Sequence, residues 1–175
     1  FRRLVNELHK AEIGVILDWT PASFPREEEG LELFDGTPLY EAADPSAAVH
    51  PMWGTLLYNY ESPMVVDFLI ANAFYWLEDC HVDGLRLDDV DAMLYLDYGR
   101  EPGQWKPNIY GTNENLAAVE FLKHLNSVVK KQIPGALVIA QEDGLWPELT
   151  SSVEDDHPGF DYKWNQGWTR DFLDY

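Results

Sequence analysis

The 175-residue sequence is poor in basic residues and contains a single cysteine. Only 12 Lys and Arg stand against 31 Asp and Glu, so the net charge is −19. Nucleic acids and anionic membrane surfaces require a basic footprint, so neither is expected as a partner, whereas an uncharged polysaccharide is not repelled. Cys80 has no second cysteine to pair with, which excludes an internal disulfide and fits a reducing, cytoplasmic location.

Long apolar runs, a leader and metal-ligand spacings are also missing. No apolar run reaches about 18 residues and no basic-apolar-small leader opens the chain, so neither a membrane span nor a secretory signal is predicted. The five histidines show no ligand spacing, which argues against a zinc site. The first residues read as the inside of a running helix, so we expect the chain to be a piece of a longer protein.

Apolar segments alternate with helical patterns along the chain. Residues 13–19, 83–88 and 136–140 read as buried strands, and the nearly continuous apolarity of the first predicts that both of its faces are covered. Stretches beginning at Pro63 and Leu116 have helical apolar spacing, and the later one places Leu116, Val119, Leu122, Leu125 and Val129 on its apolar face. The expected core residues of the earlier helix are Val66, Phe68, Ile70, Phe74 and Leu77.

Polar residues end each predicted strand, and long segments, 20–61 and 89–113, follow the first two. This order predicts an α/β fold, either a barrel or an open doubly wound sheet. No Gly-rich phosphate loop follows a strand, and acids gather at the strand ends, which favours the barrel. We therefore expect a partial TIM (β/α)8 barrel of about three consecutive strands, with residues 1–175 forming one fragment without an internal domain boundary.

The stretch from Asp83 to Asp88 is the most informative part of the sequence. Arg86 and Asp88 are two residues apart, so on a strand they share a face and the guanidinium can keep the carboxylate ionised. Taken alone, this pattern favours a structural Arg–Asp pair that closes a strand over a catalytic one. Paired carboxylates around a pocket are what glycoside chemistry requires, and the other strand ends supply Asp18 and residues 141–143. Tryptophans in or near the loops could stack on sugar rings or pack beneath the loops.

Several strings together resemble the 1,4-α-glucan (glycogen) branching enzymes of the α-amylase family. They cover nearly the whole chain in the expected order: Gly14-Val15-Ile16-Leu17-Asp18-Trp19, Phe34-Asp35-Gly36-Thr37, Leu39-Tyr40-Glu41, Trp53-Gly54-Thr55, Asp83-Gly84-Leu85-Arg86, Met93-Leu94-Tyr95-Leu96-Asp97-Tyr98, Glu114-Asn115-Leu116, Tyr162-Lys163-Trp164-Asn165 and Gly167-Trp168. The resemblance implies transfer of an α-1,4-glucan segment to a 6-hydroxyl, with Asp88 as the nucleophile and no cofactor or metal. It also implies substrate contacts from Asp18, Trp19, Ser23 and Arg86.

Three positions depart from the family's pattern. Ser23 stands where the family has a sugar-binding His and is too short to reach as far, and Asp89 stands where a small residue is usual. A second acid there is expected to raise the pKa of Asp88 by like-charge repulsion. Gln141 occupies the acid/base position, where an amide cannot donate a proton. Glu142 could replace it only if a bulge shifted the strand by one residue.

Two further hypotheses stay open beside the branching enzyme: a catalytically silenced, glucan-binding homologue, and a relative that hydrolyses α-glucans. The family's third carboxylate lies on a later strand than this chain reaches, so we expect the isolated chain to be inactive. Unpaired outer strands also predict self-association of the isolated chain. A dilute monomer in size-exclusion chromatography would contradict that expectation.

Overall fold

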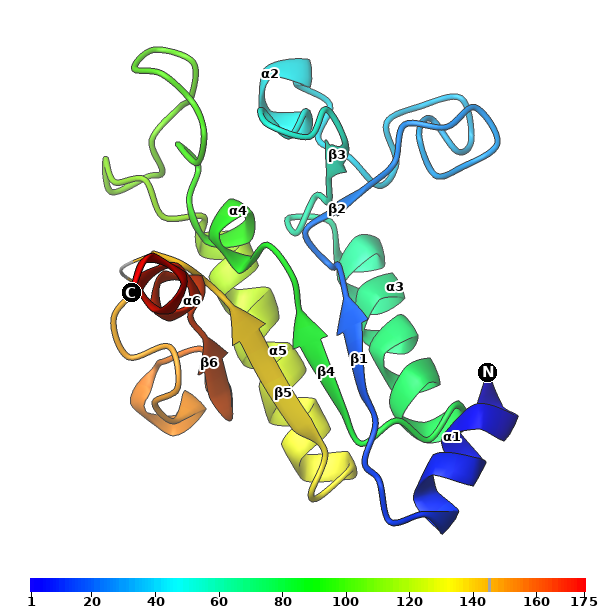
Figure 1. Ribbon diagram of the computed structural model, residues 1–175. Coiled ribbons are helices and arrows are strands. Elements are labelled where there is room, and N and C mark those ends of the chain that lie inside the picture. Colours follow the sequence, from blue (N-terminus) through cyan, green and yellow to red (C-terminus); the bar gives the residue numbers. More distant parts are fainter. Residues whose placement is uncertain (145) are drawn as a thin grey trace.

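A four-stranded parallel sheet forms the centre of the molecule (Figure 1). The structure is a computed structural model and describes residues 1–144 and 146–175. The strand order is β1-β4-β5-β6 and every pairing is parallel. The strands are β1 (Ile16–Trp19), β4 (Gly84–Leu87), β5 (Leu137–Gln141) and β6 (Tyr162–Trp164). The three predicted strands are present, and β6 adds a fourth that its short length hid in the aromatic tail.

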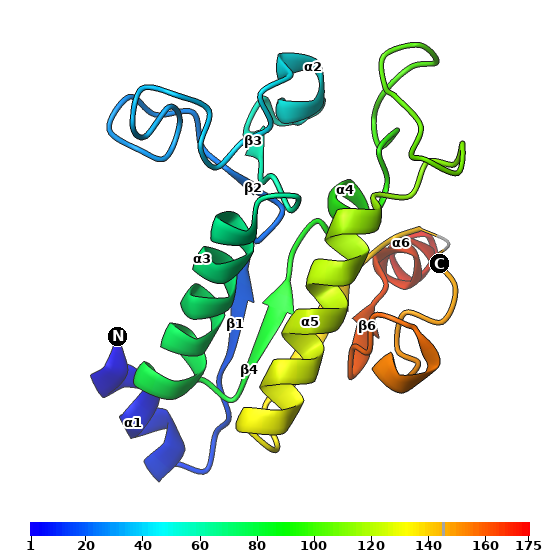
Figure 2. The same cartoon turned by 180° about the vertical axis from the view of Figure 1, so that it is seen from behind.

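Helices cover one face of this sheet, as the view from behind shows (Figure 2). The long helices of that layer are α3 (Pro63–Phe74), which runs into a π-helical turn (Tyr75–Asp79), and α5 (Leu116–Gln132). The remaining α-helices are α1 (Arg2–Lys10), α2 (Pro45–Ala48), α4 (Val90–Leu94) and α6 (Gln166–Asp174), and a 3-10 turn covers Val153–Asp155. The strand–helix–strand order from β1 through α3, β4 and α5 to β5 matches the predicted α/β pattern.

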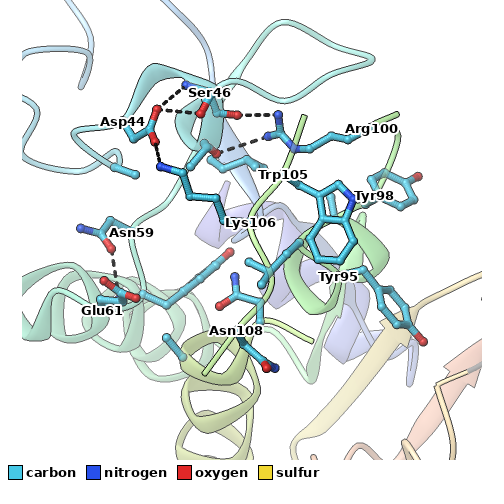
Figure 3. Close-up of a pocket in the computed structure, with 18 of the residues that line it drawn as sticks. Asp44, Ser46, Asn59, Glu61, Tyr95, Tyr98, Arg100, Trp105, Lys106 and Asn108 are labelled. Atoms are coloured by element: carbon cyan, nitrogen blue, oxygen red, sulfur yellow. Dashed lines mark hydrogen bonds and ion pairs between the residues drawn. The ribbon is translucent and has the colours of Figure 1, made fainter. Parts of the chain in front are cut away.

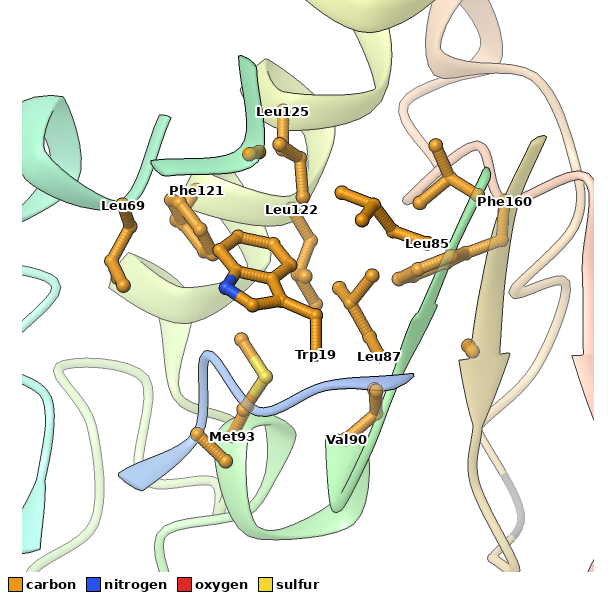
Figure 4. Packing of buried hydrophobic residues seen from close by; sticks show 14 of the residues in the cluster. Trp19, Leu69, Leu85, Leu87, Val90, Met93, Phe121, Leu122, Leu125 and Phe160 are labelled. Atoms are coloured by element: carbon orange, nitrogen blue, oxygen red, sulfur yellow. The ribbon is translucent and has the colours of Figure 1, made fainter. Parts of the chain in front are cut away.

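The main core lies between the sheet and these helices (Figure 4). Leu85 and Leu87 of β4 face Leu122 and Leu125 of α5, and all four are fully buried. α5 begins at Asn115, whose side chain accepts a hydrogen bond from the amide of Ala118 at 3.3 Å, as an N-cap does. Its predicted core positions are confirmed at Val119, Leu122, Leu125 and Val129, while Leu116 is half-buried.

The predicted core residues of α3 and the turn after it are confirmed only in part, because four of them pack at the edge of the core and not inside it. The buried positions are Val65, Leu69 and Ala73, followed by the predicted Leu77 in the π-helical turn. The other four predicted core residues, Val66, Phe68, Ile70 and Phe74, are only half-buried. Apolar residues occur on most sides of this helix, so their spacing alone does not identify which side meets the sheet.

The second face of the sheet is open, so the prediction that both faces of β1 are covered was also wrong. Leu17 and Trp19 point to the helices, but Ile16 is 41% exposed on the opposite face. Because register partners in parallel strands share a face, Asp18 and Arg86 lie together on this open face. We call this surface, with the carboxyl ends of its strands, the open face.

The segment after β1 is not a structureless loop. It contains β2 (Ser23–Phe24) paired with β3 (Leu56–Leu57), and α2 lies between them. A small core of Phe24, Ala48 and Leu56 supports this unit. Two-residue strands are too short to show a period in the sequence, and for that reason they were missed. Within the described ranges, no helix has the length and hydropathy of a membrane span.

β1 and β5 approach β4 closely at Gly84, so we predict that a side chain at this position destabilises the protein. A Cβ at this position would lie 2.6 Å from the carbonyl oxygen of Leu137 and 2.9 Å from Cδ1 of Ile16. Gly84→Ala should lower the free energy of unfolding by about 1–3 kcal/mol, because backbone must move to admit the methyl group. Urea denaturation measures the change. Gly14→Ala is the control, since its Cβ would meet only ordinary contacts at 3.6 Å; equal effects at both positions would contradict the argument.

Candidate active site

Arg86 is the centre of a charged cluster on the open face. Its Nε donates to Oδ1 of Asp18 at 2.6 Å, across the β1–β4 pairing, and its Nη1 lies 3.5 Å from Oδ1 of Asp88. The guanidinium also lies over the Trp164 ring, 5.7 Å from the centroid. The structure therefore brings Asp18, Arg86 and Asp88 together, with an aromatic ring beside them.

The electrostatics of this cluster keep one carboxylate engaged and leave the other accessible. The hydrogen bond from Arg86 lowers the pKa of Asp18, and the same bond raises the pKa of Arg86. Asp88 keeps 43% of its side chain exposed, with Arg86 beyond short hydrogen-bonding distance. Its backbone amide donates to the carbonyl of Trp19 at 2.9 Å, which ties the end of β4 to β1.

Gln141 also reaches the cluster. The backbone amide of Asp89 donates to Oε1 of Gln141 at 3.3 Å, so the side chain of residue 141 lies beside the residue that follows Asp88. Asp89 has the left-handed backbone conformation, with φ of 60°. Burial raises the pKa of Asp89, and the charge of Asp88 adds to this, while the neighbouring His50 opposes it. Asp88, Asp89 and Gln141 thus form one unit at the ends of β4 and β5.

Glu142 lies behind the sheet rather than on the open face. It is fully buried and pairs with Lys163. Its Oε1 accepts the backbone amide of Trp146 at 3.3 Å, and Lys163 also donates to the carbonyl of Gly144 at 3.0 Å. β5 runs in regular register with β4 and β6 through this region, so no bulge turns Glu142 toward Asp88.

Two other predicted substrate-binding residues are also outside the cluster. Trp19 is buried against the helices, and its Nε1 donates to Oδ1 of Asn72 at 2.8 Å, because its place in β1 alternates with Asp18. Ser23 is half-buried in β2, where it pairs with Leu57 rather than with the parallel sheet. Among the tryptophans predicted near loops, Trp53, Trp164 and Trp168 are exposed.

Asp91 shares the space behind the sheet with Glu142. Burial raises the pKa of Asp91 to about 6, and the adjacent Glu142 carboxyl adds to the shift. Oδ2 of Asp91 accepts a hydrogen bond from the backbone amide of Asp143 at 2.9 Å, and this bond partly offsets the rise in the pKa of Asp91. The two carboxyl groups therefore hold the backbone that leaves β5 immediately after Gln141.

The raised pKa of Asp91 predicts a pH-dependent stability. A folded pKa above the ordinary value means that the folded state binds this proton more tightly, so stability is lost as pH rises from about 4 to about 6. Asp91→Asn keeps the acceptor without the charge and should stabilise the protein by about 1–2 kcal/mol above pH 6, with little effect near pH 4. Melting temperatures between pH 4 and pH 8 measure this. An identical profile for Asp67→Asn, at an exposed position of α3, would contradict it.

A pocket of about 710 Å³ lies apart from this cluster, between the loop unit that contains α2 and the segment after α4 (Figure 3). Neither Arg86 nor Asp88 lines it. Several polar groups at its rim already pair with one another. Arg100 donates to the carbonyls of Ser46 and Val49 at 2.6 and 2.8 Å, and Lys106 donates to Asp44 at 2.9 Å. These contacts join the two loop regions.

Among the described residues, no group of three or more His, Cys, Asp or Glu side chains is arranged to hold a metal ion. The sequence did not predict the role of His50, the histidine that contacts this site. It lies 39 residues from Asp89, and its Nε2 is 2.8 Å from the Asp89 carboxylate. No local spacing could have revealed that contact.

Comparisons with known proteins give both sequence and structural relatives. Over all 175 residues the chain is 55% identical to the 1,4-alpha-glucan branching enzyme GlgB of Butyrivibrio fibrisolvens and covers 27% of that protein. A Salmonella typhimurium structure assigned as an α-amylase matches 94% of the chain and 24% of its own length, with a TM-score of 0.65 and 20% identity. The α-amylase of Geobacillus thermoleovorans in complex with acarbose matches 82% of this chain and 28% of its own length, with a TM-score of 0.53 and 21% identity.

The chain spans about a quarter of the length of the curated relatives that it matches. No protein-family model matches it. The structural likeness identifies the four parallel strands and their helices as part of the barrel found in α-amylases. The predicted partial (β/α)8 barrel is therefore confirmed.

Proposed function

Because this chain is a homologue of the 1,4-α-glucan branching enzymes of the α-amylase family, we propose that it forms the part of such an enzyme's catalytic barrel that carries the nucleophile. The observation that carries the proposal is the arrangement of Asp18, Arg86 and Asp88 on the open face, with the side chain of residue 141 at the backbone amide of Asp89, which directly follows Asp88. All 175 residues belong to this single barrel domain in the proposal.

Asp88 is the nucleophile in this proposal. Its carboxylate attacks the anomeric carbon of an α-1,4-linked glucan, and the bond to the leaving 4-oxygen breaks with its electron pair on that oxygen. The product is a glycosyl ester of Asp88. A 6-hydroxyl of a second glucan chain then attacks the same carbon, frees the carboxylate and leaves an α-1,6 branch. Arg86 lies beside the Asp88 carboxylate, with its Nη1 3.5 Å from Oδ1, and Asp18 orients Arg86.

Both steps need a proton carrier, and position 141 is where the proposal places it. A carboxyl there would protonate the leaving 4-oxygen and later accept the proton of the 6-hydroxyl. The amide of Gln141 can do neither, and Glu142 is buried behind the sheet. The protein that contains this chain is therefore proposed to be a branching enzyme whose acid/base function is absent or strongly reduced.

A second candidate function, a glucan-binding homologue without catalysis, is favoured by the same Gln141. The experiment that separates the two uses the full-length protein with amylose. Branch formation is measured by debranching the product and analysing chain lengths, and maltooligosaccharide affinity is measured by calorimetry. Transfer by the native protein or by its Gln141→Glu variant supports the enzyme, and binding without transfer by both proteins supports the second candidate. Release of reducing ends without new α-1,6 links would instead indicate an α-glucan hydrolase.

α-1,4-Glucans are the proposed substrates, and no cofactor is proposed for either step. Inactivity and self-association of the isolated 175-residue chain remain predictions. β1 and β6 are the outer strands of the described sheet, and their unpaired edges support the prediction of self-association.

A further inference from the structure

His50 is a buried histidine whose two ring nitrogens have different partners. It has no exposed surface, and the rings of Trp53 and Tyr98 lie 6.4 and 5.9 Å from it between centroids. Its Nδ1 accepts the backbone amides of Met52 and Trp53, each at 3.2 Å. An acceptor nitrogen carries no proton, so in the neutral ring the proton lies on Nε2.

The protonated nitrogen of His50 is directed at Asp89. Nε2 donates to Oδ2 of Asp89 at 2.8 Å, and the Asp89 side chain is only 16% exposed. A carboxylate with so little water around it depends on this donor for its orientation. His50 therefore holds the side chain of the residue that immediately follows Asp88.

Asp89 links His50 to Asp88 and Gln141, the two residues to which the proposed function assigns the reaction. Its φ of 60° and ψ of 40° are the left-handed conformation, which non-glycine residues adopt only where their surroundings support it. In this conformation its amide donates to Oε1 of Gln141 at 3.3 Å. The same turn fixes how Asp88 leaves β4.

The segment that carries His50 is itself anchored. Arg100 donates to the carbonyl oxygens of Ser46, Ala47 and Val49 at 2.6, 3.3 and 2.8 Å. Val49 directly precedes His50, so the Arg100 guanidinium fixes the backbone immediately before this histidine. A side chain with a fixed backbone, a fixed tautomer and a buried partner is suited to position another group rather than to react.

We propose that His50 is a positioning residue. Through Asp89 it sets the turn after Asp88 and aims the Asp89 amide at the oxygen of residue 141. The roles of Asp88 and residue 141 rest on the proposed function, but the coupling of His50 to Asp89 does not. A glutamate at 141 would have one oxygen held by this amide and the other directed to the substrate.

The test compares His50→Leu with His50→Gln in the full-length protein, because Gln keeps an N–H donor near the place of Nε2. His124→Gln on the exposed side of α5 is the control. Hydrogen–deuterium exchange of the peptide that contains residues 88–91 reads the positioning directly. Fluoride release from α-maltosyl fluoride reads Asp88, because fluoride leaves without protonation.

We expect His50→Leu to exchange faster at residues 88–91 alone, and to release fluoride about 100-fold more slowly with KM nearly unchanged. His50→Gln should restore most of both. If exchange responds in this way but no protein releases fluoride, the positioning role holds and the proposed function fails. Unchanged exchange at residues 88–91, or a uniform increase over the whole protein, would overturn the inference.

Discussion

Gln141→Glu in the full-length protein should increase branch formation on amylose by about 10²–10⁴-fold, the usual contribution of a positioned acid/base. The site is otherwise prepared for the carboxyl. Residue 141 lies on the open face beside the Asp88–Asp89 turn, and the Asp89 amide that now donates to Gln141 can donate to a glutamate oxygen in the same way. The change replaces an amide by a carboxyl of nearly the same shape, so the fold should not be disturbed.

Gln132→Glu at the exposed end of α5 is the matched control, since it adds the same charge away from the site. It should leave the rate unchanged. The measurement is the number of α-1,6 links formed per enzyme over time. If the native protein branches as fast as Gln141→Glu, another group carries the proton, and the assignment of residue 141 is wrong.

Asp88→Asn should abolish fluoride release from α-maltosyl fluoride, a loss on the order of 10³-fold or more. This donor bypasses the missing acid, because fluoride departs as an anion. The native protein is therefore expected to show a burst of fluoride as Asp88 is glycosylated, followed by slow turnover, since Gln141 cannot activate an acceptor. The size of the burst therefore measures the glycosylation of Asp88 alone, independently of the missing acid/base at position 141.

The control for this change is Asp174→Asn, in the exposed last turn of α6. It removes the same charge far along the chain from β4 and should keep the burst. A burst that persists in Asp88→Asn would assign the nucleophile to another residue, and Asp18 would then be the next one to replace.

The sequence predicted what depends on local pattern and resemblance. Alternation in β4 placed Arg86 and Asp88 on one face, and their 3.5 Å contact confirms it. The same period-of-two argument predicts that neighbouring residues such as Gln141 and Glu142 face opposite sides, as they do. The order of strands and helices predicted an α/β fold, and the acids at the strand ends together with the lack of a Gly-rich phosphate loop favoured the partial barrel.

What the sequence missed depends on contacts between distant segments. The resemblance implied that Trp19 contacts the substrate, but the alternation of β1 turns its side chain to the helix layer, where it donates to Asn72. The face of α3 was misjudged because apolar residues occur on most of its sides. His50 could be linked to Asp89 only in three dimensions, because the loop unit with β2 and β3 folds back over the end of β4.

The most direct test of the central claim, that Asp88 is a working nucleophile beside a disabled acid/base position, is to locate the covalent intermediate. The full-length protein is mixed with α-maltosyl fluoride, quenched in acid and digested, and the peptides are analysed by mass spectrometry. We predict a maltosyl adduct on Asp88 that accumulates in the native protein and turns over quickly in Gln141→Glu. An adduct on another residue, or no adduct in either protein, would contradict the account.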